Sequence, residues 1–217
     1  MINEKNNQKY LKSLREEFNR TLYFEGKYIT HVERARKIKM SAGATKNSLY
    51  GLFPPHKHVQ ILLDSSKLGK IVTTEKDIDF KYYFDADGKV ILIERFDPTS
   101  QYNDKLVSTI FVEHEKRQIN ALFCKGKTGN ISTVAQCKLD LYGRLVRYVE
   151  CTCGVNGYPY LYSVLRLRHV AGRIKIKHSV YSIWQEGDGT LLSERKYTYR
   201  NGKLTPTTRE TELVRNR

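Results

Sequence analysis

The sequence predicts a mainly β protein: a long antiparallel meander of repeated hairpins that forms a curved sheet or an open barrel, with one or two N-terminal α-helices. The first observation is a turn-like tetrad that recurs at intervals of 27 to 30 residues, with its second residue at positions 88, 116, 143, 172 and 202. Four of the five tetrads place Gly before Lys or Arg, so glycine supplies the positive φ of a tight hairpin turn. The second is composition, because 15 tyrosines against 2 methionines favour strands over helical bundles.

Two helices are predicted before the strands begin. Over residues 4–22, four apolar residues recur at helical spacing. A second helix is predicted over 31–40, because Thr30 and Glu33 have the spacing of a capping box at its start. The segment 41–57 contains glycines and a Pro-Pro pair, so it is predicted to be a loop. The chain is thereby divided into a helical N-terminal segment and loop, 1–57, and a hairpin-repeat domain, 58–217.

From residue 58 onward, apolar and polar residues alternate as they do in half-buried strands. About twelve antiparallel strands are expected, and a twisted sheet of that size is expected to curve. A first hairpin is predicted between 59–63 and 70–74. The other predicted pairs are 78–84 with 89–96, 106–113 with 117–124, 131–139 with 144–153, 158–169 with 173–184, and 191–200 with 203–213.

The hairpins carry a family resemblance. The segments 82–90 (YYFDADGKV) and 197–204 (YTYRNGKL) place an aromatic strand before a turn that contains Asp or Asn, Gly and Lys. On these residues the chain, over roughly 78–210, resembles Tyr-Asp (YD) repeats and MORN-type repeats. The tetrad 115–118 departs from the pattern because it lacks glycine. The resemblance implies a scaffold or interaction surface, as in bacterial antitoxin and immunity proteins built from such hairpins, and it implies no catalytic residues.

Charge points to an acidic partner. The chain has 38 Lys and Arg against 23 Asp and Glu, a formal net charge of +15. A charge of this size speeds association with nucleic acid, an anionic membrane or an acidic protein, but it does not choose among them.

The chain is predicted to be cytoplasmic and to fold without disulfides. Residues 1–12 are almost wholly polar, unlike a signal peptide, and no run approaches the roughly 20 apolar residues of a membrane-spanning helix. Four cysteines are then expected to remain thiols.

Candidate metal and catalytic residues are few. His56 and His58 could present two imidazoles to a metal ion, but two ligands are too few. Cys151 and Cys153 lie on one face of a predicted strand, with Cys137 expected across the ladder; a zinc or redox role is open, and small buried hydrophobes are favoured. No spacing among the histidines and glutamates singles out an acid–base pair. We therefore expect no cofactor and favour a non-enzymatic protein.

The most suggestive functional surface is the hairpin formed by 158–169 and 173–184. If its turn is centred on 171–172, Arg168 faces Lys175 and Arg166 faces Lys177, and like charges directly opposed destabilise a sheet. A bound anion would compensate; the alternative is a solvated outer face. The candidate binding residues on this hairpin are Arg166, Arg168, Arg173, Lys175 and Lys177, with Tyr160 and Tyr162 extending the same face.

The predicted function is that of a bacterial immunity-type or antitoxin-type protein, which captures an acidic protein through this basic, Tyr-rich β-surface. The alternative is binding of RNA or single-stranded nucleic acid. In that mode bases stack on aromatic side chains, and a basic groove contacts the phosphate backbone. A metal-independent nuclease is less favoured, and the oligomeric state is left open. In the nucleic-acid alternative, helix cations also contact phosphates: Arg34, Arg36, Lys37 and Lys39.

Overall fold

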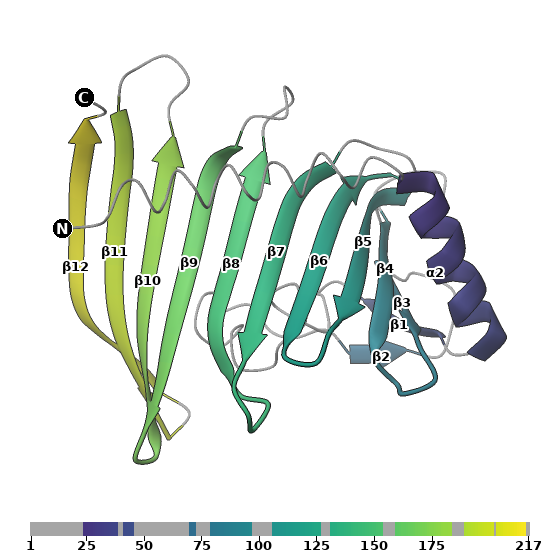
Figure 1. Cartoon of the computed structure of the whole chain (residues 1–217), viewed down its shortest axis with the longest axis horizontal. Coiled ribbons are helices and arrows are strands. Elements are labelled where there is room, and N and C mark those ends of the chain that lie inside the picture. Colours follow the sequence, from purple (N-terminus) through teal and green to yellow (C-terminus); the bar gives the residue numbers. More distant parts are fainter. Residues whose placement is uncertain are drawn as a thin grey trace.

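The protein is one long antiparallel sheet with a helix at one end of the row of strands (Figure 1). The computed structural model describes residues 24–38, 41–45, 70–72, 79–96, 106–126, 131–153, 159–183, 189–201 and 203–215. The elements are α2 (Phe24–Ile38), β1 (Ser41–Thr45), β2 (Lys70–Val72), β3 (Phe80–Phe84), β4 (Val90–Phe96), β5 (Leu106–His114), β6 (Gln118–Lys125), β7 (Ile131–Leu139), β8 (Leu145–Cys153), β9 (Pro159–Val170), β10 (Arg173–Ile183), β11 (Gly189–Arg200) and β12 (Lys203–Arg215).

Strand order confirms the predicted meander. Among the described strands the order is β12-β11-β10-β9-β8-β7-β6-β5-β4-β3-β1-β2, so the sheet is open, with β12 and β2 at its two edges. From β3 to β12 each strand pairs antiparallel with the next in sequence. The five hairpins predicted around the tetrads are all present.

The turn residues explain why those hairpins could be predicted from the sequence. Gly88, Gly143 and Gly172 have φ values of 73°, 71° and 74°, a region that glycine enters without a steric penalty. Ala171 and Asn201 also have positive φ, at 40° and 51°. The conformation of each turn is therefore determined by four or five neighbouring residues.

The predicted start of the second helix is wrong. The helix α2 begins at Phe24, seven residues earlier than expected, so Thr30 lies inside the helix and the capping-box interpretation fails. Tertiary contacts hold the additional turns: the Tyr28 ring meets Phe111 edge to face, with centroids 6.2 Å apart, and the Tyr28 hydroxyl donates to the Glu94 carboxylate. Val32 and Ala35 are buried on one face of α2.

At the β1–β2 edge of the sheet, one prediction is wrong and others lie outside the described residues. The segment 41–45, predicted as loop, is strand β1, and it pairs with both β3 and β2. Within the described residues β2 pairs with β1. The predicted pairing of 70–74 with 59–63 stays a prediction. The predicted helix 4–22 and strand 59–63 lie outside the described residues.

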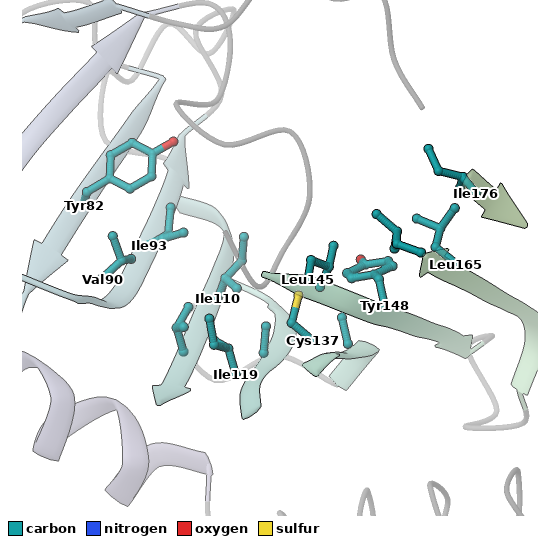
Figure 2. Packing of buried hydrophobic residues seen from close by; sticks show 14 residues of the cluster. Tyr82, Val90, Ile93, Ile110, Ile119, Cys137, Leu145, Tyr148, Leu165 and Ile176 are labelled. Atoms are coloured by element: carbon teal, nitrogen blue, oxygen red, sulfur yellow. The ribbon is translucent and has the colours of Figure 1, made fainter. Parts of the chain in front are cut away.

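Two apolar clusters lie on opposite faces of the sheet. The first is a strip that runs from Tyr82 on β3 to Ile176 on β10 (Figure 2). The second lies between α2 and the other face, where Val32 and Ala35 pack with Leu92 and Phe111. Because both faces are covered at β4, five consecutive residues from Val90 to Glu94 are buried.

Burial on β9 differs from burial on β4, and this difference positions the candidate site. On β9, buried Leu165 and Leu167 alternate with exposed Arg166 and Arg168. One face there belongs to the first apolar cluster, while the other presents cations. None of the helices in the described ranges is long and apolar enough to span a membrane.

Candidate functional site

A straight line of cations crosses five neighbouring strands. Lys138 pairs in register with Arg147, Arg147 with Arg166, Arg166 with Lys177, and Lys177 with Lys196. Register partners project from the same face of a sheet, and neighbouring strands lie about 4.8 Å apart, so the line is about 19 Å long. We call these five residues, one each from β7 to β11, the basic row.

The basic row lies on the face that α2 covers at the other end of the sheet. Val134 packs against the cluster beneath α2 and is four residues from Lys138 on β7, so strand alternation puts both on that face. The neighbours Cys137 and Tyr148 are buried in the cluster on the opposite face. Three members of the row, Lys138, Arg166 and Lys196, are exposed, and Arg147 and Lys177 are half-buried.

The register predicted for the β9–β10 hairpin is confirmed. Arg168 is opposite Lys175, and Arg166 is opposite Lys177. Arg168 and Lys175 are both exposed and form a second cationic pair, nearer the turn than the row. Arg173 is exposed at the turn itself, opposite Val170.

One carboxylate of the chain itself pairs with a member of the row. Lys177 Nζ lies 2.6 Å from Glu194 Oε1, which also accepts from Ser179 Oγ at 3.1 Å. Burial pushes the pKa of Glu194 up, but these two hydrogen bonds and the charges of Lys177 and Lys196 outweigh it and hold the pKa below its ordinary value. Glu194 is therefore ionised at neutral pH and offsets one charge of the five.

The predicted tyrosines lie on β9. Tyr162 is opposite Tyr181 on β10 and Cys151 on β8, and it is four residues from Arg166 along the strand. Tyr160 belongs to the same strand. The structure does not describe the side chains of these two tyrosines, so the proposal that they stack with bases stays a prediction.

Arg34, the helix cation whose side chain is described, is not brought to the basic row. Arg34 Nη2 donates to Asp85 Oδ2 at 2.9 Å, which ties α2 to the turn between β3 and β4. In Figure 1, α2 stands at the β1–β5 end of the sheet, away from β9–β11. Arg36 and Lys37 belong to α2, but their side chains are not described, and Lys39 lies outside the described residues.

The opposite face holds a small polar cluster within the apolar strip. Ser163 Oγ lies 3.0 Å from His178 Nε2, and Tyr148 Oη donates to Glu150 Oε2 at 2.8 Å. Burial, and secondarily the charge of Arg195, lower the pKa of His178 to about 4, so the imidazole is neutral at physiological pH. Neutral His178 and Ser163 satisfy each other's hydrogen bonds within a core, which is a structural role.

The cysteine prediction is partly wrong. Cys137 is opposite Tyr148, whereas Cys151 is opposite Val134, so the two thiols are on different faces of the sheet. Both are buried, as expected of small hydrophobes, and burial raises the pKa of Cys137 to about 12. Among the described residues no three His, Cys, Asp or Glu side chains gather as metal ligands, and His56 and His58 lie outside them.

Three members of the basic row were missed from the sequence: Lys138, Arg147 and Lys196. Within a hairpin the turn fixes the register, which is why Arg166 and Lys177 could be matched. Lys138 and Arg147 pair within the β7–β8 hairpin, where a bulge beside Lys138 shifts the register that the turn sets. Between hairpins, from β8 to β9 and from β10 to β11, the register depends on the longer connections. The available signal was that all three are cations on strands adjoining the predicted basic hairpin.

No protein-family model, curated protein or solved structure matches this chain.

Proposed function

We propose that this protein binds single-stranded nucleic acid, with the phosphates of one strand lying along the basic row. The observation that carries the proposal is the row itself: five neighbouring strands each place a cation on one transverse line. Like charges directly opposed destabilise a sheet, and a polyanion bound along the line relieves that repulsion. Phosphates supply a linear charge of this kind and give the affinity of sequence-independent binding.

The exposed positions of the row make the proposal testable without damage to the fold. Lys138, Arg166 and Lys196 are all exposed, so their replacement by Gln removes three charges and leaves the core intact. Exposed Lys116 and Arg117, in the turn between β5 and β6, provide a matched control of two charges away from the row.

Affinity for a fluorescein-labelled dT15 oligonucleotide, measured by anisotropy between 50 and 200 mM NaCl, is the test. Glu194 offsets Lys177, so four cations of the row are left for phosphates, and release of counterions at these four gives a slope of log K against log salt of about −2.8. The triple variant K138Q/R166Q/K196Q keeps one of these contacts, at Arg147, and should fall to a slope of about −0.7. The control K116Q/R117Q should keep the wild-type slope. A triple variant that binds with the wild-type affinity and slope would exclude the row as the site.

The second candidate function is capture of an acidic protein, in the manner of an immunity or antitoxin protein. The observation that supports it is the Lys177–Glu194 ion pair, in which a member of the row already pairs with a carboxylate of the chain itself. Charge complementarity with such a partner would speed association. The sheet would then serve as the interaction surface that the hairpin repeats imply.

Material that co-purifies with the tagged protein from its native cells separates the two candidates. Nucleic acid that nuclease removes, and that the triple variant does not retain, supports the first. An acidic protein in stoichiometric amount, retained in 0.5 M salt by the wild type and lost with the triple variant, supports the second. A packed interface keeps affinity at that salt, because screening acts mainly on exposed charges.

A further inference from the structure

The tip of the β7–β8 hairpin exposes two large apolar side chains. Leu141 has 73 % and Tyr142 has 81 % of its surface exposed, the highest values among the large hydrophobic residues of the described segments. The corresponding values of the two other exposed residues, Ile29 and Val107, are 50 % and 39 %. Adjacent exposed aromatic and aliphatic residues at a turn bury little of their surface in the fold, which points to a role outside it.

The backbone beneath this tip is held firmly by one carboxylate. Asp140 Oδ1 accepts from the amides of Tyr142 and Arg144, both at 2.9 Å, and Asp140 Oδ2 accepts from Arg144 Nε at 2.7 Å. Gly143 adopts the positive φ that closes the turn. Tyr142 is thus presented on a preorganised support, so its binding would require little ordering of the loop.

A second turn of the same construction shows that Leu141 and Tyr142 are not needed to build it. In the β3–β4 turn, Asp85 Oδ1 accepts from the amides of Asp87 and Lys89, at 3.0 and 2.9 Å, and Gly88 has the same positive φ as Gly143. The two residues that correspond to Leu141 and Tyr142 are Ala86 and Asp87. The same turn therefore forms with a small residue and a polar one.

The charges around Tyr142 suit an aromatic anion. Arg144 Cζ lies 5.0 Å from the centre of the Tyr142 ring. Lys138 and Arg147, which begin the basic row, belong to the same hairpin, and at about 3.3 Å per residue Lys138 is roughly 10 Å from the tip. Tyr142 thus lies to one side of the row, beyond the ends of β7 and β8 that carry Lys138 and Arg147.

We infer that Tyr142 is a stacking platform for a base of the nucleic acid strand whose phosphates lie along the basic row. This inference rests on the proposed function and deepens it, because the row holds the backbone while Tyr142 contacts a base. Stacking of an unpaired base on an aromatic ring requires no hydrogen-bond readout, so the platform accepts bases of any sequence. The ligand class is then a single strand with accessible bases rather than any polyanion.

The experiment compares dT15 with a 15-mer that has the same phosphates but abasic sites in place of all bases. Wild-type protein should bind dT15 more tightly than the abasic probe by roughly 5- to 150-fold, the contribution of one stacked base. Tyr142→Ala should remove that difference and leave the salt slope unchanged. Tyr142→Phe should retain it, because the ring remains. Asp87→Ala, at the corresponding position of the β3–β4 turn, is the matched control and should change neither quantity.

Each other outcome contradicts the inference in a recognisable way. Equal binding of dT15 and the abasic probe by wild type, with a slope that the triple variant still reduces, overturns the platform and leaves the proposed function standing. Loss of affinity for both probes on Tyr142→Ala overturns stacking in favour of a backbone contact. Failure of wild type to bind either probe removes the proposed function and the platform together, and it leaves the tip as a contact for a protein partner.

Discussion

His178 makes the stability of the protein depend on pH. Its pKa is about 4 in the folded chain, lowered by burial and by Arg195, against about 6.5 when unfolded, so the folded state binds fewer protons between these values. The contribution of neutral His178 to the free energy of unfolding is complete above pH 6.5. It is lost as the pH falls towards 4, by up to about 3 kcal/mol. Urea unfolding at pH 7 and pH 4 should therefore show a larger loss for wild type than for His178→Gln. Parallel losses in the two proteins would contradict the assignment.

Cys137 should be unreactive in the native protein. Burial raises the pKa of this thiol to about 12, so almost none of it is thiolate at pH 8, and the thiolate is the reactive form. Iodoacetamide at pH 8, followed by peptide mapping, should leave Cys137 unmodified until urea is added. Rapid native labelling would show that solvent reaches this part of the apolar strip.

At the scale of elements, the turns set the accuracy of the hairpin predictions. Asp140, Gly143 and Arg144 fix the β7–β8 turn through contacts at most four residues apart, so the sequence sufficed. The strand β1 has the sequence SAGAT, which lacks β-branched residues except at its end, and it forms because β3 and β2 flank it. Long-range pairing of this kind leaves no local signal. The extra turns of α2 depend in the same way on Phe111 and Glu94, distant in the sequence.

The β9–β10 turn contains a residue that should be improvable. Ala171 has a φ of 40°, a left-handed conformation that costs an L-residue about 1–2 kcal/mol, whereas Asn tolerates it better. Ala171→Gly should raise the free energy of unfolding by about 1 kcal/mol, less the added entropy of the unfolded chain. Asn201→Gly, in the β11–β12 turn, is the matched control and should gain less. Urea denaturation midpoints decide it, and a destabilised Ala171→Gly would mean that the alanine side chain makes a stabilising contact.

At the scale of the whole molecule, the basic row should lower the stability of the fold. With a net charge of +15 and cations opposed on neighbouring strands, the chain repels itself. The variant K138Q/R166Q/K196Q should therefore be more stable than wild type in 20 mM salt, by about 1 kcal/mol, and this advantage should shrink in 0.5 M salt as screening grows. K116Q/R117Q should show a smaller gain. A triple variant less stable than wild type at low salt would mean that the row contributes to the fold.

The architecture and the candidate site were predictable to different degrees for one physical reason. The open meander and the pairing of strands in each hairpin follow from the alternation of apolar and polar residues and from the turn residues, and both of these signals are local. The pairs within one hairpin, Arg166–Lys177 and Lys138–Arg147, depend on a turn, and the second also on a bulge beside Lys138. The joining of these pairs into one row depends on registers between hairpins. Lys196, for example, joins Lys177 through a register that no turn in the sequence specifies.

The basic row also has a handedness. The strands of a twisted sheet rotate with one hand from each to the next, so the line on which the row runs is not flat. A flexible single strand can wind along such a line, whereas a stiff duplex or a flat protein surface cannot follow it fully. Under the proposed function, bending stiffness as well as charge would therefore decide which ligand the row holds.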